Sequence, residues 1–240
     1  AECGGDYYCV KKVTSHNPPH LLFRVQELIR QLKQKLTVSP HPGTLTIVKE
    51  SRAWGFLLYN QTMEYLKTIK DEDIFEHPEF EKPAVFEKRT TVKAVVIDNE
   101  GKFGFVTNPV HGFYLLAGGG AESNDFEKEI KRECDEEINF EVEVLGEIGR
   151  VHEYRNREAK EYETVCFVVK VIKKTGEDTR TEDEKKNDLS VVWLNSKDAQ
   201  KILKEQVLKV KNGEVGFYNT AFNIVRDQLF FAEIFRQKND

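Results

Sequence analysis

The chain has 240 residues, of which 39% are hydrophobic and 32% are charged, and its formal net charge is −5. A chain of this size forms one large domain, or one domain with a smaller companion, and can bury a core that needs no disulfide or metal. It holds no run of about 18 apolar residues and opens on no apolar signal segment, so we predict no membrane-spanning helix and expect a cytoplasmic location.

The first 70 residues differ in charge from the rest. They hold ten Lys or Arg and five Asp or Glu, a net charge of +5, which leaves −10 on residues 71–240. The acidic remainder argues against nucleic acid wrapped around the main domain. The basic part leaves room for contact with an anionic partner, although a solvated face is the commoner meaning of such a bias.

The N-terminal elements predict a small unit of their own. Residues 21–36 carry apolar side chains at helical spacing, residues 44–49 and 54–59 are patterned as strands, and residues 62–74 as a second helix. A polar segment with two prolines follows and is predicted to be a linker. We therefore expect a small α+β N-terminal extension over residues 1–82, of unknown role, and a main domain over residues 83–240.

The four cysteines fall into two pairs. Cys3 and Cys9 form a CX5C pattern, which leaves pairing and metal binding both open, with no CXXC or His pair nearby. Cys134 and Cys166 lie in apolar-patterned segments, so we predict that they are small core residues.

After residue 83 the pattern changes to strands interleaved with few helices. The strands are predicted at residues 91–98, 103–107, 113–117, 141–149, 161–171 and 189–194, and the helices at 126–137, 196–204 and 216–235. The first two strands flank an NEGK turn and predict a hairpin. This arrangement indicates an α/β sandwich around a mixed sheet.

Residues 118–140, GGGAESNDFEKEIKRECDEEINF, join a glycine cluster to an acidic helix. The segment holds eight Asp or Glu and three Lys or Arg. Asn124 or Asp125 is placed to cap the helix, and Arg132 to orient the carboxylate of Glu136 one turn later. Like charges this close repel, and carboxylates so crowded suit a shared hard cation such as Mg2+ or Mn2+. The crowded glutamates are Glu129, Glu133, Glu136 and Glu137.

Two blocks of this segment carry a family resemblance. Residues 132–140 (RECDEEINF) follow the order Arg-Glu-X-X-Glu-Glu, and residues 114–122 (YLLAGGGAE) form an apolar strand that runs into glycines. Together they resemble the Nudix box, GX5EX7REUXEEXGU with U aliphatic, and the resemblance extends over roughly residues 88–236. It implies a Nudix-type α/β/α sandwich around a mixed sheet, and hydrolysis of a nucleoside diphosphate linked to another moiety.

The resemblance also assigns roles within the site. It gives the divalent cation, Mg2+ with Mn2+ as an alternative, to three glutamates: Glu133, Glu136 and Glu137. One of them would also orient or deprotonate the attacking water, and Arg132 would assist them. Metal or phosphate would approach the backbone of three glycines, which carry no Cβ: Gly118, Gly119 and Gly120.

The segment departs from the family pattern in its loop. Asn124 stands where the pattern has its first Glu, which assists the metal or pairs with the arginine, and Asp125 would serve instead if the loop shifted. Ala117 replaces the usual Pro. Asn139 replaces the usual Gly, a mild change because Asn tolerates the left-handed conformation that ends a helix. We expect a weakened or altered metal site that remains active.

Candidates outside the segment are less specific. The family often draws a further carboxylate from another loop, for which Asp188 is the first candidate and Glu184 the second. Both lie in the polar run TEDEKKND, which suits a solvated loop equally well. His111 and Phe113, before the glycines, are candidate substrate contacts, although a loop His is more often incidental.

The C-terminal region is rich in aromatic side chains. Residues 216–235 form a helix that is apolar on more than one side, so we expect another element to cover it. Its aromatics and Trp193 could stack a nucleobase, but a place in the core or in a homodimer surface is favoured. These aromatics are Phe217, Tyr218, Phe222, Phe230, Phe231 and Phe235.

Two functions remain open. The first is a metal-dependent pyrophosphohydrolase for a nucleotide-type small molecule. Nucleoside or deoxynucleoside triphosphates are the default, because no signature of other family branches follows Phe140. The second is a Nudix-fold nucleotide-binding regulatory module with little or no catalysis. The intact glutamates favour the enzyme, whereas the missing loop Glu and the basic N-terminal helix favour the module. No helix-turn-helix or zinc pattern indicates a nucleic-acid site.

Overall fold

The structure is a computed structural model that describes residues 65–107, 112–175 and 190–236. The elements and cysteines predicted within residues 1–64 lie outside the described residues, as do His111, Glu184 and Asp188. None of the helices in the described ranges is both long and apolar enough to cross a membrane.

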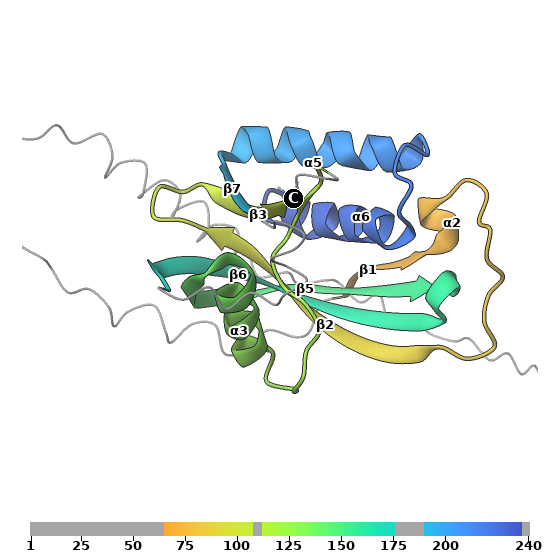
Figure 1. Cartoon of the computed structure of the whole chain (residues 1–240), viewed down its shortest axis with the longest axis horizontal. Helices are drawn as coiled ribbons and strands as arrows, with labels where there is room; N and C mark the ends of the chain where they lie inside the picture. Colours follow the sequence, from red (N-terminus) through yellow and green to blue (C-terminus); the bar gives the residue numbers. More distant parts are fainter. Residues whose placement is uncertain (1–64, 108–111, 176–189, 237–240) are drawn as a thin grey trace, which may run out of the picture.

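Within the described residues, seven strands form one mixed sheet (Figure 1). The strands are β1 (Tyr65–Lys70), β2 (Glu87–Ile97), β3 (Phe103–Thr107), β4 (Tyr114–Leu115), β5 (Phe140–Arg155), β6 (Lys160–Lys174) and β7 (Ser190–Leu194). Their order is β1-β5-β6-β2-β3-β4, and β7 also pairs with β3. β1 runs parallel to β5, and β2 runs parallel to β6. The other pairs are antiparallel, including the predicted hairpin of β2 and β3.

Helices cover both faces of this sheet (Figure 1). α3 (Phe126–Ile138) packs on one face, while α5 (Ser196–Lys211) and α6 (Tyr218–Glu233) lie on the other. α2 (Asp71–Ile74) follows β1, and a short 3-10 helix (Asn156–Glu158) joins β5 to β6. The predicted α/β/α sandwich around a mixed sheet is confirmed.

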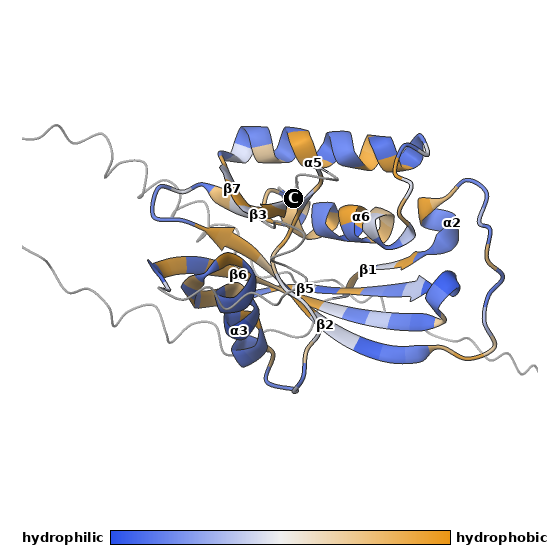
Figure 2. Ribbon diagram, in the orientation of Figure 1, coloured by the Kyte–Doolittle hydropathy of each residue, from blue (hydrophilic) through white to orange (hydrophobic). Residues whose placement is uncertain are grey.

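The alternation of side chains along β2 explains how the sheet serves two cores. Val92, Ala94 and Val96 face α3, whereas Val95 and Ile97 face α6. Burying both faces favours a strand that is apolar at consecutive positions, and the second half of β2 has this composition. Its first half is polar, as Figure 2 shows by hydropathy, and the first three residues, Glu87–Arg89, are exposed.

The predicted apolar stripe of α3 is confirmed. Ile130 and Cys134 are fully buried against the sheet, and Phe126 packs at the margin of the same core. Asp125 caps the helix, because its carboxylate accepts a hydrogen bond from the amide of Lys128 at 3.1 Å. Asn139 ends the helix in the left-handed conformation, with φ of 57°, as its residue type allowed.

The C-terminal aromatics belong mostly to the core. Phe222, Phe230 and Phe231 are buried between α6 and the sheet, and α5 packs against α6. This confirms that another element covers the helix. Phe217 is an exception, because half of it is exposed. Trp193 packs edge-on against Phe140 at a ring distance of 5.7 Å and borders the core under α3.

The helix predicted for residues 62–74 is wrong for residues 65–70 and confirmed for residues 71–74. Tyr65–Lys70 is a strand, and the helix is limited to the single turn Asp71–Ile74. Backbone pairing with β5 outweighs the local helical pattern, and it buries Ile69 completely. Residues 65–74 thus pack on the main sheet although we predicted them in the N-terminal extension. The division of the chain at residue 82 stays a prediction.

Candidate functional site

The glycine loop, residues 117–121, follows β4 and runs antiparallel to residues 90–94 of β2. The amides of Val92 and Ala94 donate to the carbonyls of Gly119 and Ala117, each at 2.9 Å. Gly118 has φ of 125°, and a Cβ there would lie 2.2 Å from the carbonyl oxygen of Val92. Only glycine permits this close approach, because any Cβ would collide with the backbone of β2. The backbone hydrogen bonds then hold the loop against the strand.

The helix α3 presents two of its glutamates to this loop. The Glu137 carboxylate accepts a hydrogen bond from the amide of Gly118 at 2.6 Å. The Glu133 carboxylate lies directly over Gly119, where a Cβ would be 2.6 Å from its Oε2 atom. The predicted glycines and two predicted metal ligands are therefore brought together.

Arg132 contacts three carboxylates of α3 at once. Its guanidinium donates to Glu136 at 2.6 Å, to Glu133 at 2.8 Å and to Glu129 at 2.9 Å. It also donates to the carbonyl of Gly120 at 3.1 Å. The contact between Arg132 and Glu136 is the one expected from their spacing. We call the set Glu129, Arg132, Glu133 and Glu136 the α3 cluster.

The electrostatic states of the cluster members differ. Burial raises the pKa of the Glu133 carboxyl, although the charges of Arg132 and Lys93 oppose this shift. Hydrogen bonds from Ser123 and then from Arg132 lower the pKa of the Glu129 carboxyl to about 2. Burial works against the charge of Arg132, but its bond to Glu129 and the charge of Glu133 outweigh burial and raise its pKa. The ionised form of Glu129 is thus favoured by its hydrogen bonds, whereas burial disfavours the ionised form of Glu133.

Two residues of the site were not singled out by sequence reasoning. Glu129 was counted among the crowded acids without a role, yet it contacts Arg132 and also accepts from the Ser123 hydroxyl at 2.7 Å. Lys93 donates to the carbonyls of Leu116, at 3.1 Å, and Gly118. Its signal was a lysine inside the otherwise apolar run TVKAVVI.

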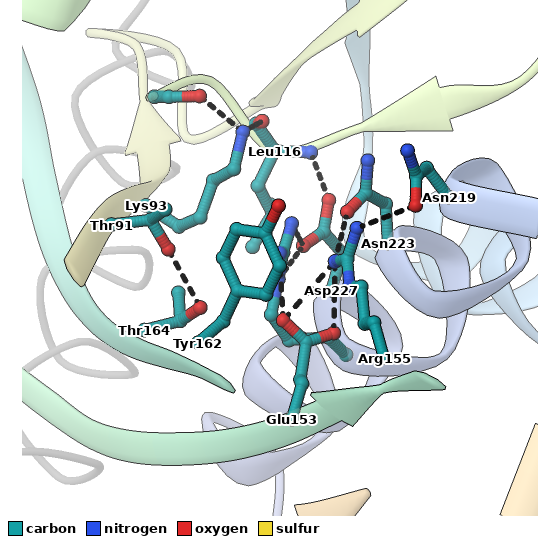
Figure 3. Close-up of polar contacts among 12 residues, drawn as sticks. Thr91, Lys93, Leu116, Glu153, Arg155, Tyr162, Thr164, Asn219, Asn223 and Asp227 are labelled. Atoms are coloured by element: carbon teal, nitrogen blue, oxygen red, sulfur yellow. Dashed lines mark hydrogen bonds and ion pairs between the residues drawn. The ribbon is translucent and has the colours of Figure 1, made fainter. Parts of the chain in front are cut away.

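The strand leading into the glycines is held from the helix side. Gln206 of α5 accepts from the amide of Tyr114 at 2.6 Å and donates to its carbonyl at 3.0 Å. Asp227 of α6 accepts from the amide of Leu116 at 2.8 Å, a contact that Figure 3 shows beside Lys93. The position of the glycine loop therefore depends on both C-terminal helices.

Asp227 belongs to a buried network of charges beneath α6 (Figure 3). Arg226 binds Asp227 at 2.9 Å and Glu153 at 3.3 Å, and Arg155 binds Glu153 at 3.1 Å. Arg155 also donates to Asn223 at 2.8 Å and stacks over the ring of Tyr162. We call Glu153, Arg155, Arg226 and Asp227 the α6 network. All four are almost completely buried.

The three predicted metal ligands are hydrogen-bonded within the protein, Glu133 and Glu136 to Arg132 and Glu137 to the amide of Gly118. Among residues 65–107, 112–175 and 190–236, no three His, Cys, Asp or Glu side chains converge as around a metal ion. The three predicted ligands, Glu133, Glu136 and Glu137, nevertheless offer carboxylate oxygens, which are the donors that a hard divalent cation prefers. These residues therefore fit the ion in donor type, while Arg132 is paired with two of them, Glu133 and Glu136.

The other predicted site residues are placed apart or not described. Phe113 packs at the margin of the core under α6 rather than at the α3 cluster. Asp188, Glu184 and His111 lie outside the described residues, so their assignment stays a prediction.

Comparisons with known proteins find distant likeness only. No protein-family model matches the chain, and no curated protein matches it in sequence. Solved structures to which it is similar include a NUDIX hydrolase from Nitrosomonas europaea, with 14% identity, a TM-score of 0.40, and 58% of this chain and 89% of that chain covered. A MutT protein from Methanosarcina mazei Go1 has 15% identity and a TM-score of 0.38, covering 65% and 98%. A UDP-X diphosphatase has 20% identity and a TM-score of 0.36, covering 48% and 54%.

Proposed function

We propose that the protein is a metal-dependent hydrolase of a nucleoside diphosphate linked to another moiety. The observation that supports this most is the placement of the α3 carboxylates against the glycine loop. Glu137 binds the amide of Gly118, Glu133 lies over Gly119, and Arg132 links Glu136 to the carbonyl of Gly120. Acidic groups and a closely approached backbone are combined at one place, as polyphosphate chemistry requires.

The proposed ligands of the divalent cation, Mg2+ or Mn2+, are three glutamates of α3: Glu133, Glu136 and Glu137. Such an ion supplies charge neutralisation of the diphosphate and a more acidic water. The three glycines from Gly118 to Gly120 leave room beside the backbone for substrate oxygens.

The residues of the chain itself have distinct proposed roles. Burial raises the pKa of Glu133 and so makes its carboxylate a stronger base, which suits acceptance of a proton from the attacking water. Arg132 orients Glu133 and Glu136 through its two direct contacts. Asp188 is proposed as a further carboxylate that approaches the same site.

The substrate class is proposed from the sequence alone. Nucleoside or deoxynucleoside triphosphates are the default, because residues after Phe140 carry no signature of the branches with other substrates. A soluble nucleotide in the cytoplasm is the partner that this proposal expects, and a homodimer is compatible with it.

A regulatory nucleotide-binding module is the second candidate, and one observation favours it. Arg132 contacts Glu133 and Glu136 at 2.8 and 2.6 Å, so a positive charge already lies between two proposed ligands. A module of this kind would hold a nucleotide without cleaving it and act through the N-terminal region.

One assay separates the two candidates. Purified protein is incubated with Mg2+ or Mn2+ and a panel of nucleotide diphosphate derivatives, and Glu136→Gln is tested beside it. We expect turnover of at least one compound, and a loss of about 100-fold or more in kcat for the variant. Tight binding without any turnover would contradict the enzyme. Turnover that Glu136→Gln leaves unchanged would contradict the assignment of the site.

A further inference from the structure

Arg132 divides its hydrogen bonds between two kinds of carboxylate. Glu133 and Glu136 are proposed metal ligands, whereas Glu129 is not. Glu129 accepts from both Nε, at 3.2 Å, and one terminal nitrogen, at 2.9 Å. The same terminal nitrogen also reaches Glu133, while the other one reaches Glu136. The three carboxylates therefore share one guanidinium, and the N–H groups that bind Glu129 are less available to Glu133 and Glu136.

Glu129 is held in place independently of Arg132. Its Oε1 atom accepts from the hydroxyl of Ser123 at 2.7 Å, and its Oε2 atom accepts from the amide of Glu122 at 3.2 Å. Only 5% of the residue is exposed. A carboxylate that is buried and bonded to the loop on its far side cannot follow Arg132 toward the metal ligands. It forms a fixed anchor for one side of the guanidinium.

We propose that Glu129 is a positioning residue that shares the Arg132 guanidinium with Glu133 and Glu136, so that a divalent cation binding these two carboxylates has to displace only part of the Arg132 contacts. The inference rests on the proposed function, because it assumes that Glu133 and Glu136 bind the ion. It assigns a role to a residue for which the family pattern has no acidic position.

The physical reason is competition between two cations for the same oxygens. A guanidinium forms strong bonds with a carboxylate and cannot be deprotonated, so it competes with an entering cation for that carboxylate, and a second anion that binds the guanidinium weakens this competition. The α3 cluster has one arginine and three carboxylates. With Glu129 present, an entering ion displaces only part of the Arg132 contacts. Without it, the whole guanidinium would pair with the ligands.

The test measures Mn2+ affinity by calorimetry on the full chain without substrate. Glu129→Ala is compared with Glu127→Ala, which removes the same charge from an exposed position in the first turn of α3. We expect Glu129→Ala to weaken Mn2+ binding by about tenfold or more, the range for residues that support metal ligands. Glu127→Ala should change it by less than about threefold, because the charge of an exposed side chain is screened by salt.

Two further variants keep the test decisive if Glu129→Ala folds poorly. Glu129→Gln retains the size and an oxygen for the Ser123 hydroxyl but not the charge, so it should weaken Mn2+ binding as the alanine does. In an Arg132→Gln background the competing cation is gone. There, Glu129→Gln should leave the affinity unchanged, which a merely structural role would not produce.

The outcomes separate this inference from the proposed function. Suppose that the unaltered protein binds Mn2+ and that the changes at Glu129 and Glu127 weaken binding equally. Only net charge then matters, so the inference is overturned while the proposed function stands. The same holds if Glu129→Gln weakens binding equally with and without Arg132. If the unaltered protein binds no Mn2+, the inference falls together with the proposed function.

Discussion

The α3 cluster and the α6 network are built from the same two kinds of side chain but differ in balance and burial. The α6 network pairs two arginines with two carboxylates, and each of its members is at most 4% exposed. The α3 cluster sets one arginine against three carboxylates, and the side chains of Arg132 and Glu136 are 30% and 35% exposed.

This difference indicates different roles. Charges are tolerated in a protein interior when they are paired and hydrogen-bonded. Every charge of the α6 network is paired, although the Nε atom of Arg155 makes no hydrogen bond. An unbalanced group of carboxylates lowers stability by mutual repulsion unless something else supplies positive charge. The α6 network therefore has the properties of a structural element, and the less balanced and more exposed α3 cluster is where we propose that a ligand binds.

The largest effect should come from breaking the α6 network. Glu153→Ala leaves Arg155 and Arg226 without their shared partner in a fully buried place. We expect the free energy of unfolding to fall by about 3–5 kcal/mol, as for other broken buried pairs. Urea titration measures it, with Glu143→Ala at an exposed position of β5 as the control. A loss under about 1 kcal/mol for Glu153→Ala would contradict the structural role.

A change inside the α3 cluster should affect function and spare stability. Burial raises the pKa of Glu133, so its ionised form opposes folding at neutral pH. Glu133→Gln should therefore leave the melting temperature unchanged or slightly higher, while kcat falls by about 100-fold or more. Calorimetric melting and the nucleotide assay check both halves. A large loss of stability in Glu133→Gln would mean that the α3 cluster stabilises the fold as the α6 network does, which contradicts the difference proposed between them.

The smallest effect concerns the dependence of stability on pH. The pKa of Glu129 is lowered in the folded protein from 4.5 to about 2, so its ionised form stabilises the fold. That contribution is complete above the unfolded pKa, and it is lost as the pH falls from 4.5 toward 2. Glu129→Gln should therefore be less stable than the unaltered protein at pH 6, with the difference shrinking toward pH 2. Denaturant titrations at several pH values measure this, and an equal difference at all pH values would contradict it.

Much of the fold followed from local patterns. The apolar run TVKAVVI and the NEGK turn predicted a hairpin, and the stripe of Phe126, Ile130 and Cys134 predicted α3 with its buried face. The strand β1 was missed because its partner, β5, lies about 85 residues later in the chain. A six-residue strand with one fully buried side chain has too little pattern of its own to reveal such pairing.

The residues of the candidate site could be predicted from the sequence, but which carboxylates bind Arg132 could not. The order of Arg132, Glu133, Glu136 and Glu137 behind three glycines indicated a candidate site. The structure brings Arg132, Glu133 and Glu137 to the loop, and Glu136 contacts Arg132. Sequence spacing also suggested the contact of Arg132 with Glu136. It did not show that Glu129 would compete for the same arginine, because that depends on where the loop at Ser123 folds.

The sequence by itself determined an α/β domain with an acidic helix that follows a glycine loop, because periodicity and glycine placement act over short distances. The tertiary structure decided which charges meet. It brought Lys93 of β2 to the carbonyl of Gly118, and it joined Glu153 to Arg226 across 73 positions of the chain. Such contacts arise only when the sheet and its helices pack, since the energy of a charge depends on its neighbours in space and on the water that packing removes.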